Sequence, residues 1–291
     1  MDNNVYTNLM AQRNLVAAAD AVARLAEPAS ALGVTTEEAA SWRDAASAMV
    51  VPYDERLGVH PQHEGFTEHA RWDFANTPQE KYPLLLHYPY FQLYRSQVVK
   101  QADLVLAMHQ RGDAFTAEQK ARNFAYYEAL TVRDSSLSAC TQSVMAAEVG
   151  QLELAYRYLA EAALMDLHDV MRNTRDGLHM ASLAGAWTAL VAGFGGMRGD
   201  GGTLSFSPRL PAGISKLVFR LRYRGRRLCV TIGNRRVRYE LLDGDPLLLR
   251  HHGQELLLDG KGADREVPKV EAGPAPQQPP GREPIMHHPM G

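Results

Sequence analysis

The sequence has few cysteines, no long apolar run and almost no excess of charge. Its 291 residues contain two cysteines, Cys140 and Cys229, which lie far apart in the chain. Two distant thiols do not make a disulfide framework, so the sequence favours a reducing compartment. No apolar run reaches the ~18 residues that a membrane-spanning helix needs, and the first residues lack the basic cluster and apolar stretch of a signal peptide. We therefore expect a cytoplasmic protein with no membrane partner.

The charge balance also limits the classes of partner. Hydrophobic residues make up 45% and charged residues 22% of the chain, and the formal net charge is -2. These values are typical of a soluble globular protein of one or two domains. A net charge this small provides no overall field that attracts nucleic acid or a membrane surface.

Up to about residue 198, the sequence has the periodicity of helices. Two capping boxes, Thr35 to Glu38 and Thr116 to Gln119, place a hydroxyl three residues before a carboxylate or amide side chain. Another helical stretch ends at Gly150, a residue type that is common just after a helix. Small and apolar residues occur on more than one side of the later helices, which predicts that they pack in layers. We expect a mainly α part over residues 1–198.

The remaining sequence has the pattern of strands and then of a tail. Residues 216–223 alternate between apolar and mostly basic side chains, and Asp243-Gly244 is a typical hairpin turn. These features predict a small antiparallel β-sandwich of five or six strands over residues 199–262. Residues 263–291 are rich in proline and glycine and poor in aliphatic residues, which predicts a disordered tail.

Two stretches place polar residues close to the expected start of a helix. SQVVKQADLVLAM contains Lys100, Gln101 and Asp103 in an apolar context. Lysine and glutamine side chains can donate to sugar hydroxyls, but a solvated helix start explains this pattern as well. YYEALTVRDSSLSAC combines Glu128 and a charged pair with several serines. This combination suits an anion site at a helix N-terminus, and equally a helix cap provided by a serine.

A third stretch, NTRDGLHMASLAGAW, places Asp176, His179 and Ser182 at the start of a helix rich in small residues. A single histidine in such a place is more often structural than catalytic. The three stretches share one arrangement, because each has polar residues at a helix N-terminus. They are therefore expected at one end of the helical array.

Two further clusters have simpler explanations than a ligand. Eight arginines within 19 residues form a basic stripe: Arg220, Arg222, Arg224, Arg226, Arg227, Arg235, Arg236 and Arg238. A basic strand face can follow nucleic-acid phosphates, but the outer face of a sandwich with acidic neighbours explains the stripe, so no nucleic-acid partner is expected. Four histidines lack the spacing of metal ligands, and no metal site is predicted; they are His251, His252, His287 and His288.

Five motifs in fixed order make the sequence similar to the C-terminal part of glycoside hydrolase family 65. This family contains maltose, trehalose and kojibiose phosphorylases and related α-glucoside hydrolases. The motifs are DNNVYTNLMAQRNL, VVKQADLVLAM, YYEALTVRDSSLSAC, NTRDGLHMASLAGAW and GFGGMRGDGGTLSFSPRLP. The resemblance implies the second half of an (α/α)6 catalytic barrel over residues 1–198, followed by the C-terminal β-sandwich.

The resemblance also implies roles for individual residues. Lys100 and Gln101 match a pair that binds the non-reducing glucose. Five residues match segments that contact phosphate, which would be a co-substrate, and no cofactor is implied; they are Arg133, Ser135, Ser136, His179 and Ser182. Arg133 stands where many phosphorylases have histidine, so phosphorolysis and hydrolysis both stay open. Glu128 is the nearest carboxylate for the base of a hydrolase, or else a structural salt-bridge partner.

The reaction implied by the family is cleavage of an α-linked glucose disaccharide with inversion, in which a glutamate protonates the glycosidic oxygen. In the family this glutamate lies ahead of the segment that matches residues 2–15. Loss of a positioned acid costs about 10²–10⁴-fold in rate, so we expect residues 1–291 alone to be inactive. The alternatives are a non-catalytic half-barrel that pairs with a separately encoded N-terminal half, and an arginine-rich module that binds anions or nucleic acid. Which of trehalose, maltose or kojibiose is bound, and whether a homodimer forms, stay open.

Overall fold

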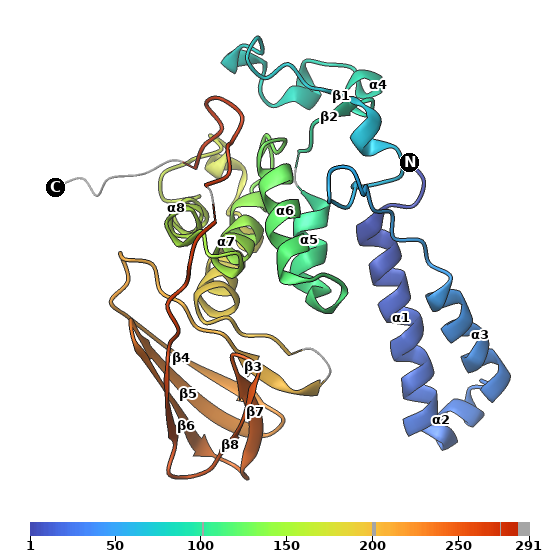
Figure 1. The fold of residues 1–291 in the computed structure, drawn as a ribbon, viewed down its shortest axis with the longest axis vertical. Coiled ribbons are helices and arrows are strands. Elements are labelled where there is room, and N and C mark those ends of the chain that lie inside the picture. Colours follow the sequence, from blue (N-terminus) through green and yellow to red (C-terminus); the bar gives the residue numbers. More distant parts are fainter. Residues whose placement is uncertain (101, 200–201, 274, 285–291) are drawn as a thin grey trace.

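The computed structural model describes residues 1–100, 102–199, 202–273 and 275–284. Its first two-thirds are helical, and a region of two small sheets follows (Figure 1). Within the described residues, no helix is long and apolar enough to cross a membrane.

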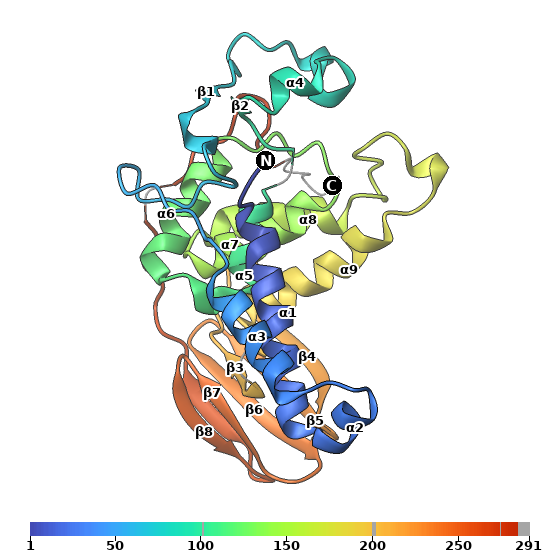
Figure 2. The ribbon, with the colours of Figure 1, turned by 90° about the vertical axis from the view of Figure 1, so that its right-hand side faces the viewer.

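The chain begins with a helical hairpin that extends away from the other helices (Figures 1 and 2). Its elements are α1 (Val5–Arg24), α2 (Ala26–Ala31) and α3 (Thr36–Ser47). The side chain of Asn4 accepts a hydrogen bond from the backbone N–H of Thr7, so one of the polar residues at the start of the chain is the N-cap of α1. Of the capping box predicted at Thr35, the N-cap half is confirmed, because the Thr35 hydroxyl accepts from the N–H of Glu38.

Residues 48–98 form an extended connection of short elements. They are η1 (Phe66–Glu68), β1 (Ala70–Arg71), η2 (Gln79–Lys81), η3 (Leu84–Leu86), α4 (Tyr90–Leu93) and β2 (Ser96–Gln97). β1 and β2 pair in parallel, which ties the two ends of this connection together. A small apolar cluster around Trp72, Leu84 and Val132 packs within it.

The centre of the molecule is a group of five longer helices. They are α5 (Asp103–Gln110), α6 (Ala117–Glu128), α7 (Ser138–Glu148), α8 (Leu152–Ala163) and α9 (Met180–Thr188). Shorter turns complete it: η4 (Gly112–Ala114), η5 (Thr174–Asp176) and the π-helical η6 (Ala189–Phe194), which continues α9. The predicted capping box of Thr116 and Gln119 is confirmed in both directions. Large buried side chains such as Tyr127, Tyr158 and Phe124 fill the core between these helices.

The C-terminal region contains two sheets with a shared apolar core. One sheet has the order β3-β7-β8 and the other the order β4-β5-β6-β9. The strands are β3 (Leu204–Phe206), β4 (Lys216–Tyr223), β5 (Arg226–Gly233), β6 (Arg236–Asp243), β7 (Leu247–His251), β8 (Gln254–Leu258) and β9 (Ala263–Glu266).

The expected antiparallel pairing is confirmed for most of the strands, with two differences from the prediction. β3 pairs with β7 in parallel. Asp243-Gly244 does not form a hairpin, since β6 and β7 belong to different sheets. The turn instead carries the chain from one sheet to the other. Whether consecutive strands pair depends on which of their faces pack into the common core.

The prediction of a disordered tail from residue 263 is also wrong for the residues that the structure describes. Residues 263–266 form β9, which pairs with β6 in antiparallel register. The chain then runs along the helices to the opposite end of the molecule (Figures 1 and 2). We call residues 267–273 and 275–284 the C-terminal strap. Its composition resembles that of a disordered segment, but its polar groups bond to the helical part, as described below.

Candidate functional site

Two of the polar stretches meet at one end of the helical group. Val99 lies beside Thr131 in a short parallel bridge. The Val99 N–H donates to the Leu130 carbonyl at 3.0 Å, and the Val132 N–H donates to the Val99 carbonyl at 2.9 Å. This bridge brings the segment before α5 next to the segment that follows α6, as expected for polar residues at one end of the array.

Lys100 lies at this junction with an exposed side chain, and it borders two cavities. Gln101, its expected partner in glucose binding, lies outside the described residues. The first cavity, of about 310 Å³, also touches His63, Tyr94 and Asp103. The second, of about 220 Å³, also touches Tyr90, Tyr94 and Asp134. The expected sugar contact is therefore next to open space with both apolar and charged walls.

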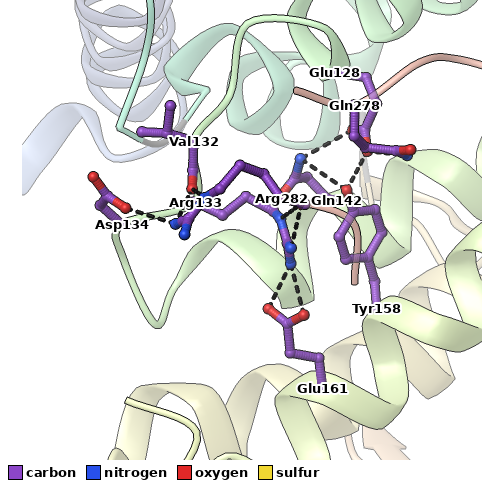
Figure 3. A network of polar contacts seen from close by, with 9 residues as sticks. All are labelled: Glu128, Val132, Arg133, Asp134, Gln142, Tyr158, Glu161, Gln278 and Arg282. Atoms are coloured by element: carbon purple, nitrogen blue, oxygen red, sulfur yellow. Dashed lines mark hydrogen bonds and ion pairs between the residues drawn. The ribbon is translucent and has the colours of Figure 1, made fainter. Parts of the chain in front are cut away.

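Glu128, the expected base of a hydrolase, is not open to solvent. Only 2% of the residue is exposed. Its carboxylate accepts hydrogen bonds from Tyr158, from Gln142 at 3.0 Å and from Gln278 at 2.9 Å (Figure 3). Burial raises the pKa of Glu128, and these hydrogen bonds offset the rise only in part. The neighbours of this carboxylate are hydrogen-bond donors rather than the salt-bridge partner that we considered.

Arg133, the expected phosphate ligand, is engaged by protein groups. Its terminal nitrogen lies 2.6 Å from both carboxylate oxygens of Glu161, and its other nitrogens donate to the carbonyl of Arg282 (Figure 3). The side chains of the pair are only 7% and 10% exposed. Burial opposes the charge of Arg133, but Glu161, together with Tyr158 and Glu128, outweighs this effect and raises the arginine pKa. The φ of Arg133 is +55°, so its backbone adopts a left-handed conformation at this point.

Asp134 links the segment after α6 to the residues just before α4. One carboxylate oxygen accepts from the Leu84 N–H at 2.8 Å, and the other accepts from the Arg282 guanidinium at 2.6 Å. Ser135 and Ser136 follow at half-buried positions beside the start of α7. The Ser135 hydroxyl accepts from the Leu137 N–H at 3.3 Å, as a capping residue would, and the phosphate contact of both serines stays a prediction.

The C-terminal strap covers this network from outside. Gln151 donates to the Gly273 carbonyl at 2.8 Å, where the strap passes the turn between α7 and α8. Farther along, Gln278 reaches Glu128, and the Arg282 guanidinium donates to Asp134 and to the Val132 carbonyl. No periodicity or motif in the sequence indicates Gln278 or Arg282, because their partners are about 150 residues away.

A third cavity, of about 420 Å³, lies where the strap meets the helices. Three arginines are part of its wall, namely Arg133, Arg172 and Arg282. Asp134 is the acidic residue of the same wall. Arg133 and Arg282 each pair with a carboxylate, so the exposed Arg172 is the cation of this wall that is most open to an anion.

His179 and Ser182, in the third polar stretch, bond to other parts of the protein. The ring nitrogen Nδ1 of His179 lies 2.6 Å from one carboxylate oxygen of Asp166. The backbone N–H of His179 donates to the other oxygen of that carboxylate at 2.9 Å. Ser182 is fully buried, and its hydroxyl donates to the Ala162 carbonyl at 3.1 Å. Neither residue is part of the walls of the three cavities described above, so their phosphate contacts stay predictions.

The two other clusters in the sequence also have structural partners. His251 is buried in the sandwich and bonds to the Tyr239 hydroxyl and the Glu266 carbonyl, each at 2.9 Å. His287 and His288 lie outside the described residues, among which no group of three or more metal-ligating side chains occurs. In the arginine stripe, Arg227 pairs with Asp243, and Arg238 pairs with Glu240 and Asp264.

Comparisons with known proteins identify two family regions in this chain. Residues 1–188 match the model of the glycosyl hydrolase family 65 central catalytic domain. Residues 197–258 match the model of the C-terminal domain of the same family. The boundary between the two matches falls where the helices give way to strands.

Individual relatives agree with this assignment. The chain is 62% identical over 288 residues to an uncharacterized glycosyl hydrolase of Mycobacterium tuberculosis, covering 97% of this chain and 36% of the relative. It is 43% identical over 263 residues to the α,α-trehalose phosphorylase of Geobacillus stearothermophilus, covering 88% of this chain and 34% of the relative. A solved structure from the human microbiome, provisionally described as a kojibiose phosphorylase, superposes with a TM-score of 0.80 at 27% identity over 91% of this chain and 37% of that protein. The chain thus spans about a third of the length of the relatives it matches.

Proposed function

Because the chain belongs to glycoside hydrolase family 65, we propose that it supplies the C-terminal part of an inverting disaccharide phosphorylase. The substrate class is an α-linked glucose disaccharide, with trehalose, maltose and kojibiose as the candidates. The helical residues would form the second half of an (α/α)6 barrel. The general acid would come from a part of the protein outside residues 1–291.

One observation carries the proposal. The exposed Lys100 stands between two cavities, at the point where the segment before α5 pairs with the segment after α6. A disaccharide needs two neighbouring spaces, and an ammonium group at their boundary can donate to hydroxyls of a sugar bound in either space. Most of the lining is apolar or aromatic with a few charged groups, as expected for a small-molecule site.

The choice of phosphate over water as nucleophile has two supports. In the wall of the 420 Å³ cavity, two of three arginines pair with carboxylates, and the exposed Arg172 can offer its charge to an anion. A hydrolase instead needs a carboxylate that can touch water, and Glu128 is buried beneath Gln278. Since Arg133 already binds Glu161 and Arg282 binds Asp134, we assign the anion contact in this cavity mainly to Arg172.

Each group has a defined task in the proposed reaction. The carboxylic acid donates a proton to the glycosidic oxygen as the bond to the anomeric carbon breaks. A phosphate oxygen attacks that carbon from the opposite face, which converts the α linkage into β-glucose 1-phosphate and releases glucose. The residues of this chain would bind the sugar and the anion. They would not transfer a proton.

The test is complementation by the N-terminal part of a relative, which this chain does not include. We would co-express residues 1–291 with the remaining N-terminal part of the Mycobacterium tuberculosis relative and supply each disaccharide with and without phosphate. We expect phosphate-dependent release of glucose 1-phosphate, which Lys100→Ala abolishes and the distant surface change Lys216→Ala does not. Glucose release that needs no phosphate would identify a hydrolase, and an inactive but stable complex would contradict the catalytic proposal.

A second experiment tests the part played by these residues alone. We propose that purified residues 1–291 bind sugar but do not turn it over. Any glucose or glucose 1-phosphate formed by the pure chain would show that its own side chains supply the acid. The same preparation is the starting material for the binding measurements below.

A further inference from the structure

The short helix α4 presents a pair of tyrosines beside the expected sugar site. Tyr90 and Tyr94 lie four residues apart, with ring centroids 5.6 Å apart and planes inclined by only 23°. Their exposed fractions are 58% and 54%, which is unusual for two large rings that border cavities. The two rings are stacked on each other at the edge of the site.

We infer that this tyrosine pair is an aromatic subsite for one sugar ring of the disaccharide, a deepening that rests on the proposed function. The pair borders the 220 Å³ cavity together with Lys100 and Asp134. A pyranose ring has an apolar C–H face and a rim of hydroxyls. It therefore matches a site that combines aromatic faces with one cation and one carboxylate.

Tyr94 has the more central position of the two tyrosines. It borders both the 220 Å³ and the 310 Å³ cavity, whereas Tyr90 borders the first alone. Leu93, Val98 and Lys100 are the other residues common to both walls. Tyr94 thus stands where the two rings of a disaccharide would join, and its loss should affect both.

The aromatic surface is held in place by the same contacts that organise the rest of the site. The Leu84 N–H donates to Asp134. This bond ties the residues just before α4 to the segment that follows α6. Leu93 packs on the apolar cluster around Trp72 and Val132. Gln97, just after α4, donates to the carbonyls of Thr67 and His69 at 3.1 and 2.6 Å. A rigid support of this kind lowers the entropic cost of binding.

The same helix provides a matched control. Phe91 is 68% exposed but is not part of either cavity wall. The guanidinium of Arg95 lies 4.2 Å from the centroid of its ring. Removal of this ring changes the exposed aromatic area of α4 without changing the proposed subsite.

The experiment measures binding of maltose, trehalose and kojibiose to the 291-residue chain by calorimetry and by saturation-transfer NMR. For the sugar that binds best, we expect Tyr94→Ala to weaken binding about five- to tenfold and Tyr90→Ala to weaken it less. Tyr94→Phe should stay within about twofold, because the ring face is kept. Phe91→Ala should bind like the parent, and thermal unfolding should be the same for all variants.

The outcomes separate this inference from the proposed function. If Lys100→Ala weakens binding while Tyr94→Ala does not, the aromatic subsite is wrong and the sugar site at Lys100 stands. If Phe91→Ala weakens binding as much as Tyr94→Ala, the aromatic contact is not specific and the inference fails. If the parent chain binds none of the three sugars, the subsite is also overturned, and the complementation assay alone then decides the proposed function.

Discussion

The arginines of the sandwich and the arginines of the candidate site differ in what surrounds them. Arg227 and Arg238 pair with carboxylates at the surface, where side chains of the pairs are 39% to 66% exposed. Arg133 pairs with Glu161 where both side chains are at most 10% exposed. Water screens the first kind of pair and not the second, so removing one partner costs little stability at the surface and much in the buried place.

The arginines that are conspicuous in the sequence are not those of the candidate site, although the family resemblance does single out Arg133. Eight arginines within 19 residues are conspicuous, whereas Arg133, Arg172 and Arg282 are far apart in the chain. The structure brings these three to one cavity wall. Local density of charge is thus a poor guide to a site, and burial together with convergence is a better one.

The largest expected effect comes from removing the buried arginine. Arg133→Met leaves the Glu161 carboxylate without its bidentate partner in a nearly dry place, and we expect a loss of about 3–5 kcal/mol in the free energy of unfolding. Urea unfolding followed by circular dichroism measures this loss. The double variant Arg133→Met with Glu161→Leu should recover much of it, because both charges are then gone. A single-variant loss below about 1 kcal/mol would place the pair in the same class as the surface pairs.

The next effect concerns the strap that completes the buried network. A chain that ends at Val267 keeps β9 but loses the Gln278 contact to Glu128 and the Arg282 contact to Asp134. We expect a loss of about 2–3 kcal/mol, because two buried carboxylates lose donors. We also expect faster protease cleavage in residues 130–136. A chain that ends at Pro284 keeps these contacts and is the control, and equal stability of the two chains would show that the strap contributes nothing.

How much of this network the sequence reveals depends on the range of each contact. The helix caps at Thr35 and Thr116 are local, and the sequence predicts both correctly. The pairing of residue 99 with residue 131 is farther in sequence but links two motifs that were both conspicuous.

The strap is different, because a proline-rich stretch has no local pattern that shows where its few polar side chains will bond. Gln278 and Arg282 find partners about 150 residues away. The tyrosine pair of α4 was missed for a similar reason, since an exposed aromatic is informative only once the neighbouring cavity is known.

A smaller effect is expected from a buried histidine near the junction with the sandwich. Burial lowers the pKa of His109 to about 4, and the positive charges of Arg198 and Lys120 add to the effect while Glu148 opposes it. Below pH 6.5 the histidine of the unfolded chain is protonated, whereas that of the native protein stays neutral until about pH 4. The free energy of unfolding therefore falls as the pH drops from 6.5 to about 4.

We expect a lower melting temperature at pH 5 than at pH 7. His109→Gln should reduce the difference between the two temperatures, because the glutamine does not titrate. The sandwich arginines stay charged throughout this range and cannot produce the effect. A His109→Gln variant with the full pH dependence of the parent would assign the change to other groups.

The smallest effect is expected from the same substitution at the surface. Arg238→Met removes ion pairs with Glu240 and Asp264, whose side chains are 39% and 54% exposed. We expect a far smaller loss than for Arg133→Met, and a still smaller one at high salt, because exposed pairs are screened. Urea unfolding at low and high salt measures it under the conditions used for Arg133→Met. If Arg238→Met costs as much as Arg133→Met, then burial is not what distinguishes the two sets of arginines, and the role of the buried pair in shaping the site would need another cause.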